Sequence, residues 1–240
     1  MGRPLARTTR SPWPLWGGML LLCGLGCQRH PLGDGLPAKM DCSSCHGGPD
    51  NAAPPRAVNG ATSTTDIRVG AHQSHMKAGQ VSHPVACEEC HVVPTLTNTP
   101  DHPDPLSRPA AVSFGTLAKT SQASPAWDRT KATCANSYCH GATLWGGDTR
   151  PAPQWTRVDG SQLKCDACHA NPPGDSSHAA HTSFTCATCH AFVVADDSTI
   201  LNPDLHVNGR MDVAMSNGTW DPAAKTCAET SCHGSGSIAW

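Results

Sequence analysis

The fold of this chain is decided by repeated cysteine–histidine motifs, which are densest in residues 165–190, CDACHANPPGDSSHAAHTSFTCATCH. A CxxCH string stands at each end of this stretch, with a His-x-x-His pair between them. Working outward, the chain contains four CxxCH strings, at 42–46, 87–91, 165–169 and 186–190. Two related CxxxxCH strings stand at 134–140 and 227–233. We number the six motifs in chain order.

Each CxxCH motif indicates covalent attachment of c-type haem. On a helical turn, residues three apart lie about 60° from each other around the axis, so both thiols can reach the vinyl groups of one porphyrin while the next histidine ligates its iron. In a CxxxxCH motif the cysteines would lie about 140° apart, so the intervening residues must loop out. Both CxxxxCH motifs follow a Trp-Asp pair, at 127–128 and 220–221, by the same interval. We therefore expect six covalently bound haem c groups.

The predicted attachment residues belong to these motifs. The thioether cysteines are Cys42, Cys45, Cys87, Cys90, Cys134, Cys139, Cys165, Cys168, Cys186, Cys189, Cys227 and Cys232. The proximal iron ligands are His46, His91, His140, His169, His190 and His233. The alternatives are a disulfide framework or zinc sites, which would make this a structural, stapled envelope protein. Neither explains why a histidine immediately follows all six cysteine pairs.

Six further histidines recur at matching positions and are the candidate distal ligands: His72, His75, His102, His178, His181 and His206. With them, every iron would carry two imidazoles. His30 and His83 are left unassigned. Methionine ligation is the competing hypothesis, but Met76, Met211 and Met215 have no counterparts in the other half of the chain, so we interpret them as packing residues.

The motif order defines an internal duplication: CxxCH, Pro-Pro, HxxH, CxxCH, a single His, Trp-Asp, then CxxxxCH-Gly. The first three-haem repeat is predicted at residues 42–140 and the second at 165–240, joined by a linker at 141–164. The chain of 240 residues has only 38% hydrophobic and 5% aromatic residues, with 22 Gly and 21 Pro. We therefore expect a mostly irregular chain with short α-helices, organised by haem, which supplies most of the core. Helices are expected at the motifs and from about residue 67 to residue 78.

Residues 1–26 are predicted to be a signal peptide, because three arginines and no acidic residue precede a largely apolar stretch. Pro14 and a Gly-Gly pair interrupt this stretch, which is too short to span a membrane comfortably. Leu25, Gly26 and Cys27 resemble the end of a bacterial lipobox. A lipidated Cys27 would anchor the protein through an N-terminal tether, residues 27–41. Cys23 would leave with the signal, and the protein is expected in the periplasm or at the outer membrane.

Charge indicates which partners suit the chain. Without residues 1–26 it has 14 basic and 19 acidic residues, a net charge of −5. Ionised haem propionates would bring this to about −11 when oxidised and about −17 when reduced. We expect partners with positive or metal-ion surfaces and association that weakens with salt. No basic cluster supports nucleic-acid binding.

The alternating CxxCH and CxxxxCH motifs, the HxxH pairs and the His206-Val-Asn-Gly209 segment resemble the multihaem c-type cytochromes of metal-reducing and related bacteria. The resemblance covers nearly all of residues 42–234. It implies a multihaem cytochrome c fold, bis-histidine ligation and electron transport across or beyond the cell envelope, often from an outer-membrane lipoprotein. Its implied partners are other redox proteins of the envelope and extracellular metal or mineral acceptors. At His102 the sequence departs from the pattern, because Pro-Asp-Pro follows in place of Val-Asn-Gly.

The ligand set favours an electron carrier over an enzyme. An iron with imidazole in both axial positions has no place for substrate, and histidine in place of methionine lowers the haem potential. The alternative is a multihaem reductase with one open haem, for which the iron assigned to His102 is the candidate. No catalytic residue is predicted.

Overall fold

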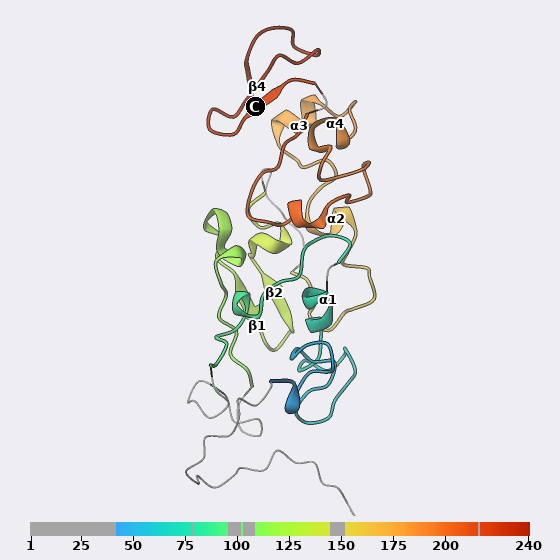
Figure 1. The fold of residues 1–240 in the computed structure, drawn as a ribbon, viewed down its shortest axis with the longest axis vertical. Helices are drawn as coiled ribbons and strands as arrows, with labels where there is room; N and C mark the ends of the chain where they lie inside the picture. The colour runs from blue at the N-terminus through green and yellow to red at the C-terminus, as the bar shows by residue number, and fades with distance from the viewer. Residues whose placement is uncertain (1–41, 78, 96–101, 103–108, 145–151, 216) are drawn as a thin grey trace, which may run out of the picture. The chain divides into compact units, whose positions relative to one another are not determined.

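The computed structural model describes residues 42–77, 79–95, 102, 109–144, 152–215 and 217–240 (Figure 1). The chain divides into two units, Met1–Leu36 and Pro37–Trp240, and every described residue belongs to the second. The predicted signal peptide, Cys27, His30 and the predicted tether therefore lie outside the described residues. In the part of the chain that is described, no helix is long and apolar enough to cross a membrane.

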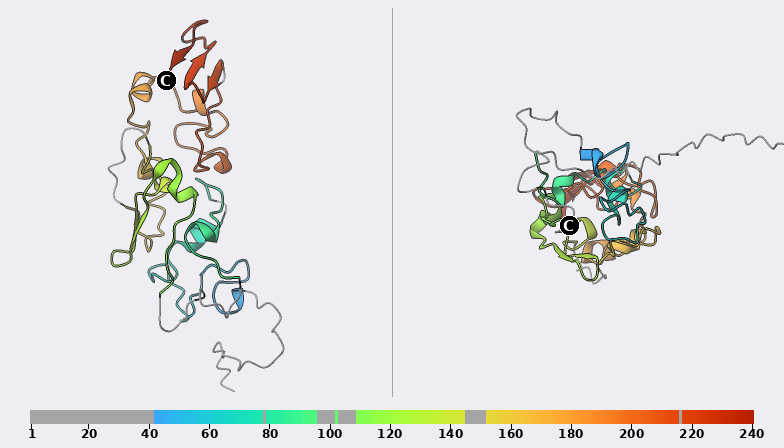
Figure 2. Two further views of the ribbon diagram at one scale, coloured as in Figure 1. Left: turned by 90° about the vertical axis from the view of Figure 1, so that its left-hand side faces the viewer. Right: turned by 90° about the horizontal axis from the view of Figure 1, so that it is seen from below.

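The described chain is mostly irregular, with short elements between loops (Figures 1 and 2). The α-helices are α1 (His72–Met76), α2 (Cys165–Cys168), α3 (Ser176–Ala180) and α4 (Ala187–His190). The 3₁₀ helices are η1 (Cys42–Ser44), η2 (Cys87–Glu89), η3 (Leu117–Gln122), η4 (Tyr138–His140) and η5 (Pro203–Leu205). The strands are β1 (Ala126–Asp128), β2 (Thr133–Ala135), β3 (Thr219–Asp221), β4 (Thr226–Ala228) and β5 (Ile238–Ala239). The prediction of irregular chain with short helices is confirmed.

Helical turns form at five of the six motifs, as η1, η2, η4, α2 and α4. The sixth motif begins on β4 and ends in a turn. In both CxxxxCH motifs the first cysteine lies on a strand, and the next residue but one has a left-handed backbone, with φ of 54° at Asn136 and 55° at Glu229. The strand and the left-handed residue are how the four intervening residues loop out.

The helix expected at residues 67–78 is shorter than predicted, because α1 begins only at His72. Gly70 has φ of +44°, and a turn ending there closes on the carbonyl of Asp66. A left-handed residue interrupts a right-handed helix, so the helix cannot extend back through this position. The prediction is correct in placing both His72 and His75 on one helical turn.

Each CxxxxCH motif has one β-hairpin, which ends before the second cysteine, and the two hairpins match. The prediction of helices and irregular chain misses both hairpins. In the first, β1 pairs antiparallel with β2, with Trp127 opposite Cys134. In the second, β3 pairs with β4, with Trp220 opposite Cys227. The hairpin turns are built alike, because the aspartate that follows each tryptophan accepts two backbone N–H groups through its side chain.

A third segment runs beside each hairpin and ends in a tryptophan. Beside β4 it is β5, and the Trp240 N–H donates to the carbonyl of Lys225 at 2.8 Å. Beside β2 it is residues 153–155, where the Trp155 N–H donates to the carbonyl of Ala132 at 2.7 Å. Ala132 and Lys225 each lie five residues after the hairpin tryptophan, so the two arrangements are equivalent.

The described chain buries very little apolar side chain. Its buried hydrophobic residues are Ala53, Ala57, Val69, Ala118, Ala132 and Val193. Four of these are alanines, and Val69 is the largest side chain that is fully buried. Packing among so few small side chains cannot offset the conformational entropy of ordering a chain this long.

Contacts also join the two halves of the described unit. The Gly209 N–H donates to the Tyr138 hydroxyl at 3.0 Å, and the Nδ1 of His206 lies 2.5 Å from the carbonyl oxygen of Val81. Both contacts span more than 70 residues of sequence. The second half thus meets the first close to motifs 2 and 3.

Candidate haem sites

The imidazole rings share one hydrogen-bonding pattern. In eight predicted ligands Nδ1 donates to a backbone carbonyl oxygen: His46, His72, His75, His91, His169, His181, His190 and His206. In a ninth, His178, the partner is the carboxylate of Asp175. A carbonyl can only accept, so each of the eight rings carries its proton on Nδ1 and leaves the Nε2 lone pair for a metal.

Four pairs of rings face each other across a narrow gap, and each pair joins a motif histidine to a predicted distal histidine. The ring centroids are 6.2 Å apart for His72 and His91, 6.2 Å for His75 and His140, 6.4 Å for His169 and His206, and 5.7 Å for His181 and His233. Two imidazoles ligating one metal from opposite sides have centroids about 6 Å apart, because each metal–nitrogen bond is about 2 Å and each nitrogen lies about 1 Å from its ring centre. The centroid separations of all four pairs match the spacing expected for two imidazoles on one iron.

The pair at motif 6 has the most direct geometry. The Nε2 atoms of His181 and His233 are 3.5 Å apart, close to the spacing of about 4 Å expected for two imidazole nitrogens on opposite sides of one metal. The two rings come from residues 52 apart in sequence, so only the fold brings them together.

Burial keeps several of these rings neutral. It lowers the pKa of His72 and of His140 to about 4, and it also lowers the pKa of His206. An imidazole must be neutral to ligate iron, so at pH 7 these side chains are ready to bind.

Burial holds seven of the motif thiols in the protonated form. Burial raises the pKa of Cys134 and of Cys139 to about 11, and the pKa of five further motif cysteines is raised mainly by burial: Cys87, Cys90, Cys186, Cys189 and Cys227. A thiol with a raised pKa is a poor nucleophile and a poor thiolate ligand at neutral pH.

Electrostatic effects between thiols indicate which motifs lie near one another. Burial makes the largest contribution to each raised pKa, and the charge of a cysteine in a neighbouring motif makes a smaller one. Cys42 acts on Cys87, and Cys90 acts on Cys134. In the second half Cys165 acts on Cys186, and Cys227 acts on Cys189. Motifs 1, 2 and 3 are therefore neighbours in that order, and motifs 4, 5 and 6 repeat the arrangement.

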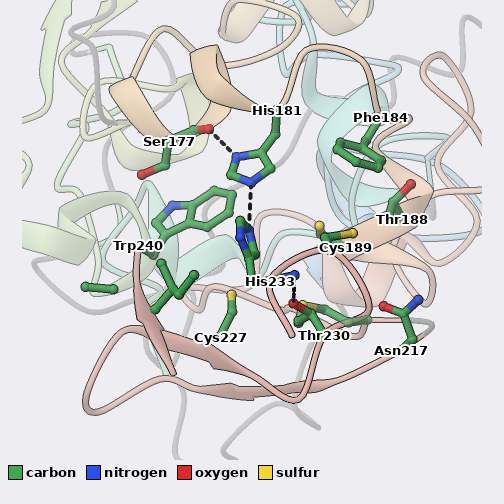
Figure 3. A pocket seen from close by; sticks show the side chains of 14 residues that line it. Ser177, His181, Phe184, Thr188, Cys189, Asn217, Cys227, Thr230, His233 and Trp240 are labelled. Atoms are coloured by element: carbon green, nitrogen blue, oxygen red, sulfur yellow. Dashed lines mark hydrogen bonds between the residues drawn. The ribbon is translucent and has the colours of Figure 1, made fainter. Parts of the chain in front are cut away.

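One cavity holds the full set of residues that a haem c requires (Figure 3). Cys227, Cys232 and His233 of motif 6 line it together with the distal candidate His181. The cavity is partly open to solvent, and its empty space, counted together with the open part, is about 690 Å³. The remaining walls are mixed, with Phe184, Met215, Ile238 and Trp240 as the larger apolar side chains. Two thiols, two opposed imidazoles and an apolar wall fit one covalently bound haem.

Two tryptophans that the sequence does not single out contact the HxxH pairs. Trp155 lies against His72 and His75, with centroid distances of 4.7 Å and 5.6 Å. Trp240 lies against His178 and His181, at 5.2 Å and 5.4 Å. Trp155 falls in the segment predicted to be a linker. The available signal was that Trp-Asp, Thr-Cys-Ala and then a further Trp occur in the same order twice.

Some predicted ligands are not brought together. Among the described residues, no histidine ring faces His46 or His190, and His102 has no hydrogen bond or ring contact. His178 contacts Trp240 and Asp175. Met76 lies against Cys87, with the two sulfur atoms 4.0 Å apart.

The arrangement of the thiols and the other side chains bears on the disulfide and zinc alternatives. No disulfide joins any two of the twelve motif cysteines. In the described ranges, no group of three or more His, Cys, Asp and Glu side chains is arranged to hold a metal ion.

Residues 133–169 match the family model described as "Geobacter CxxxxCH...CXXCH motif". The matched segment contains motif 3 and motif 4. No curated protein and no solved structure gives a significant match. The matched motifs indicate covalently bound haem c, and the chain is similar to the multihaem c-type cytochromes that carry these motifs and transfer electrons.

Proposed function

We propose that this protein is an exported hexahaem c-type cytochrome that carries electrons through a chain of closely spaced, low-potential bis-histidine haems in the cell envelope, toward extracellular acceptors. The observation that carries the proposal is the set of four facing histidine pairs, each made of one motif histidine and one distal candidate.

The internal duplication extends the four pairs to six. His75–His140 and His181–His233 occupy equivalent positions in the two halves, which supports comparing the halves directly. By the same comparison, the counterpart of His72–His91 is His178–His190, and the counterpart of His169–His206 is His46–His102. All six irons would then have two imidazole ligands, and no distal candidate is left over.

The neighbouring thiols support a path through the protein. Motifs 1 to 3 and motifs 4 to 6 are adjacent in order within each half. The distal candidate of motif 4, His206, donates to the carbonyl of Val81, which lies between the first HxxH pair and motif 2. This contact is where we propose that electrons pass from one half to the other.

Bound haem would supply one-electron exchange between ferric and ferrous iron. The chain's own residues do the rest. Carbonyl groups hold the Nδ1 protons and thereby orient the rings, and a hydrogen-bonded histidine is a more basic ligand, which stabilises the ferric state. Two imidazole ligands on each iron would keep the potentials low and deny substrate a coordination position.

A multihaem reductase is the second candidate, because His46 and His190 have no facing imidazole among the described residues. Either iron would then keep an open position. The candidate from the sequence was the iron assigned to His102. That iron is still a candidate, because His102 is the partner proposed for His46, and the iron of His190 is a second one.

Outside the described residues, the proposal includes export by the signal peptide and anchoring through a lipidated Cys27, at the periplasmic or cell-surface side of the outer membrane. Partners would be other envelope redox proteins and metal or mineral acceptors with positive surfaces. The negative charge of the holoprotein supports this choice.

Carbon monoxide binding during a reductive titration tests the function. A pure electron carrier would take up six electrons per chain in one-electron steps, and the fully reduced protein would show no rapid, stoichiometric carbon monoxide adduct. One or two adducts per chain, with turnover of a small oxidised substrate, would establish the reductase instead.

A further inference from the structure

Each HxxH pair is in contact with one tryptophan, and the contact geometry is similar in both halves. Trp155 meets the ring of His72 nearly edge-on, at an interplanar angle of 85°, and lies tilted over His75 at 32°. Trp240 meets His178 at 86° and lies nearly parallel to His181 at 18°. The first histidine of each pair thus meets the indole edge-on, and the second lies tilted over it in the first half and nearly parallel to it in the second half.

The backbone fixes both tryptophans by equivalent bonds. Trp155 donates its main-chain N–H to Ala132, and Trp240 donates its own to Lys225. The indole N–H of Trp155 also donates to the carbonyl of Ile67 at 2.9 Å. These bonds tie each tryptophan to its hairpin, and tie Trp155 to the segment that leads into α1.

A second tryptophan braces each of these rings. Trp127 and Trp155 meet edge-on with centroids 6.3 Å apart, and so do Trp220 and Trp240. The indole nitrogens of Trp127 and Trp220 are buried and have no oxygen or nitrogen partner in the described structure. Edge-on indoles prefer this arrangement because a positive ring edge points at a negative ring face.

The approach to Trp155 is too close for a side chain on the facing backbone. A Cβ added at Gly70 would lie 1.9 Å from the indole nitrogen of Trp155. Gly70 lies two residues before His72, where α1 begins, so the tight contact fixes the position of α1 against the indole.

We propose that Trp155 and Trp240 are positioning residues, each of which sets the ring planes of two distal ligands and so couples the ligand geometry of two neighbouring irons. The inference rests on the proposed function, because it assigns a role to residues that contact the proposed ligands. In the first half the two irons belong to motifs 2 and 3, and in the second half to motifs 5 and 6.

The test uses the holoprotein with Trp155→Leu, Trp240→Leu and Trp240→Phe substitutions, with Leu163→Ala as the control. Leu163 is exposed, lies in the same predicted linker (residues 141–164) as Trp155, and has no aromatic ring to contact a histidine. The readouts are haem content, low-temperature electron paramagnetic resonance, and the rate of carbon monoxide uptake by the reduced protein.

We expect each leucine variant to retain six haems and to shift the low-spin signals of two of them, with the other four unchanged. Carbon monoxide uptake at those two should rise about 2- to 10-fold, as loss of an aromatic contact would produce. Trp240→Phe should recover part of the wild-type signal. The inference is overturned if six haems are present and neither leucine variant differs from Leu163→Ala. A wild-type haem count well below six would overturn the proposed function instead.

Discussion

At the scale of single residues, the position of the imidazole proton decides what each histidine can do. Carbonyl oxygens hold Nδ1 in both motif histidines and distal candidates, which leaves Nε2 free to bind a metal, and in His181 and His233 the two Nε2 atoms lie 3.5 Å apart. Ring orientation then follows from the carbonyl that each ring meets. The planes of His72 and His91 differ by only 23°, whereas those of the other three pairs differ by 71°, 67° and 77°.

These angles predict two kinds of low-spin signal in the electron paramagnetic resonance spectrum of the oxidised holoprotein. Ferric haems with nearly parallel imidazoles give rhombic low-spin signals, and those with nearly perpendicular imidazoles give strongly anisotropic signals with a large maximum g value. We expect the three pairs with interplanar angles near 70° to produce the anisotropic type and His72–His91 to produce the rhombic type. A spectrum made only of rhombic signals at low temperature would contradict the ring geometry.

Removal of one distal ligand should change one iron. We expect His181→Ala to retain six haems and to convert the motif 6 haem to a high-spin ferric form, because His233 loses its facing imidazole. Its potential should rise, since one strong donor is lost. His83→Ala is the matched control, as His83 faces no motif histidine in the described ranges. If both variants remain entirely low-spin, the pairing is wrong.

At the scale of elements, the helical turns that present the HxxH pairs begin differently. At α3 the Asp175 side chain accepts from the N–H groups of Ser177 and His178, and its carboxylate also meets the His178 ring. At α1 no side chain caps the helix, and His72 bonds to the Val69 carbonyl instead. A carboxylate partner makes an imidazole more basic than a carbonyl partner does.

Substitution of Asp175 separates its two roles. Asp175→Ala should lower the free energy of unfolding by about 0.5–2 kcal/mol through loss of the N-cap, and it should raise the potential of the haem that His178 serves. Asp175→Asn keeps an N-cap oxygen, so we expect the higher potential with little loss of stability. Urea denaturation and a spectroelectrochemical titration measure the two effects. Equal losses of stability in both variants would contradict this division.

The elements also show how far sequence reasoning reaches. Helical turns at the motifs and the HxxH turn at α1 are local features, and their spacing predicts them. The hairpin strands are three residues long and too short to establish an alternating pattern, so the repeated Trp-Asp pair is recognised without the strand that contains it. The facing histidines and the contact of Trp155 with His72 depend on chain segments that are 19 to 83 residues apart, and spacing cannot predict such contacts.

At the scale of the whole molecule, the described chain is held together by individual side-chain and backbone contacts, because it has almost no hydrophobic core. Six small buried residues hold little apolar area, and the elements that meet do so through histidines, tryptophans and single backbone bonds. In a holoprotein, porphyrin would provide the apolar area that the side chains lack. Ligation and thioether formation would then contribute directly to folding.

Haem removal should therefore abolish most of the ordered structure. We expect the chain produced without haem attachment to be cleaved throughout residues 42–240 by a protease concentration that leaves the holoprotein intact. The comparison needs equal chain concentrations and a reducing buffer, so that disulfides do not form. An apo chain as resistant as the holoprotein would mean that side-chain packing, not haem, organises the fold.

The central claim is that all six motifs attach haem, including the two CxxxxCH motifs whose first cysteine lies on a strand. Pyridine haemochrome quantitation against the protein concentration measures this directly. The account predicts six haems per chain for the wild type and five for a Cys227→Ser/Cys232→Ser variant, which removes both thiols from the cavity at motif 6. Four haems per chain in both proteins would show that only the CxxCH motifs attach haem. A haem count near zero would favour a structural protein cross-linked by disulfides or zinc.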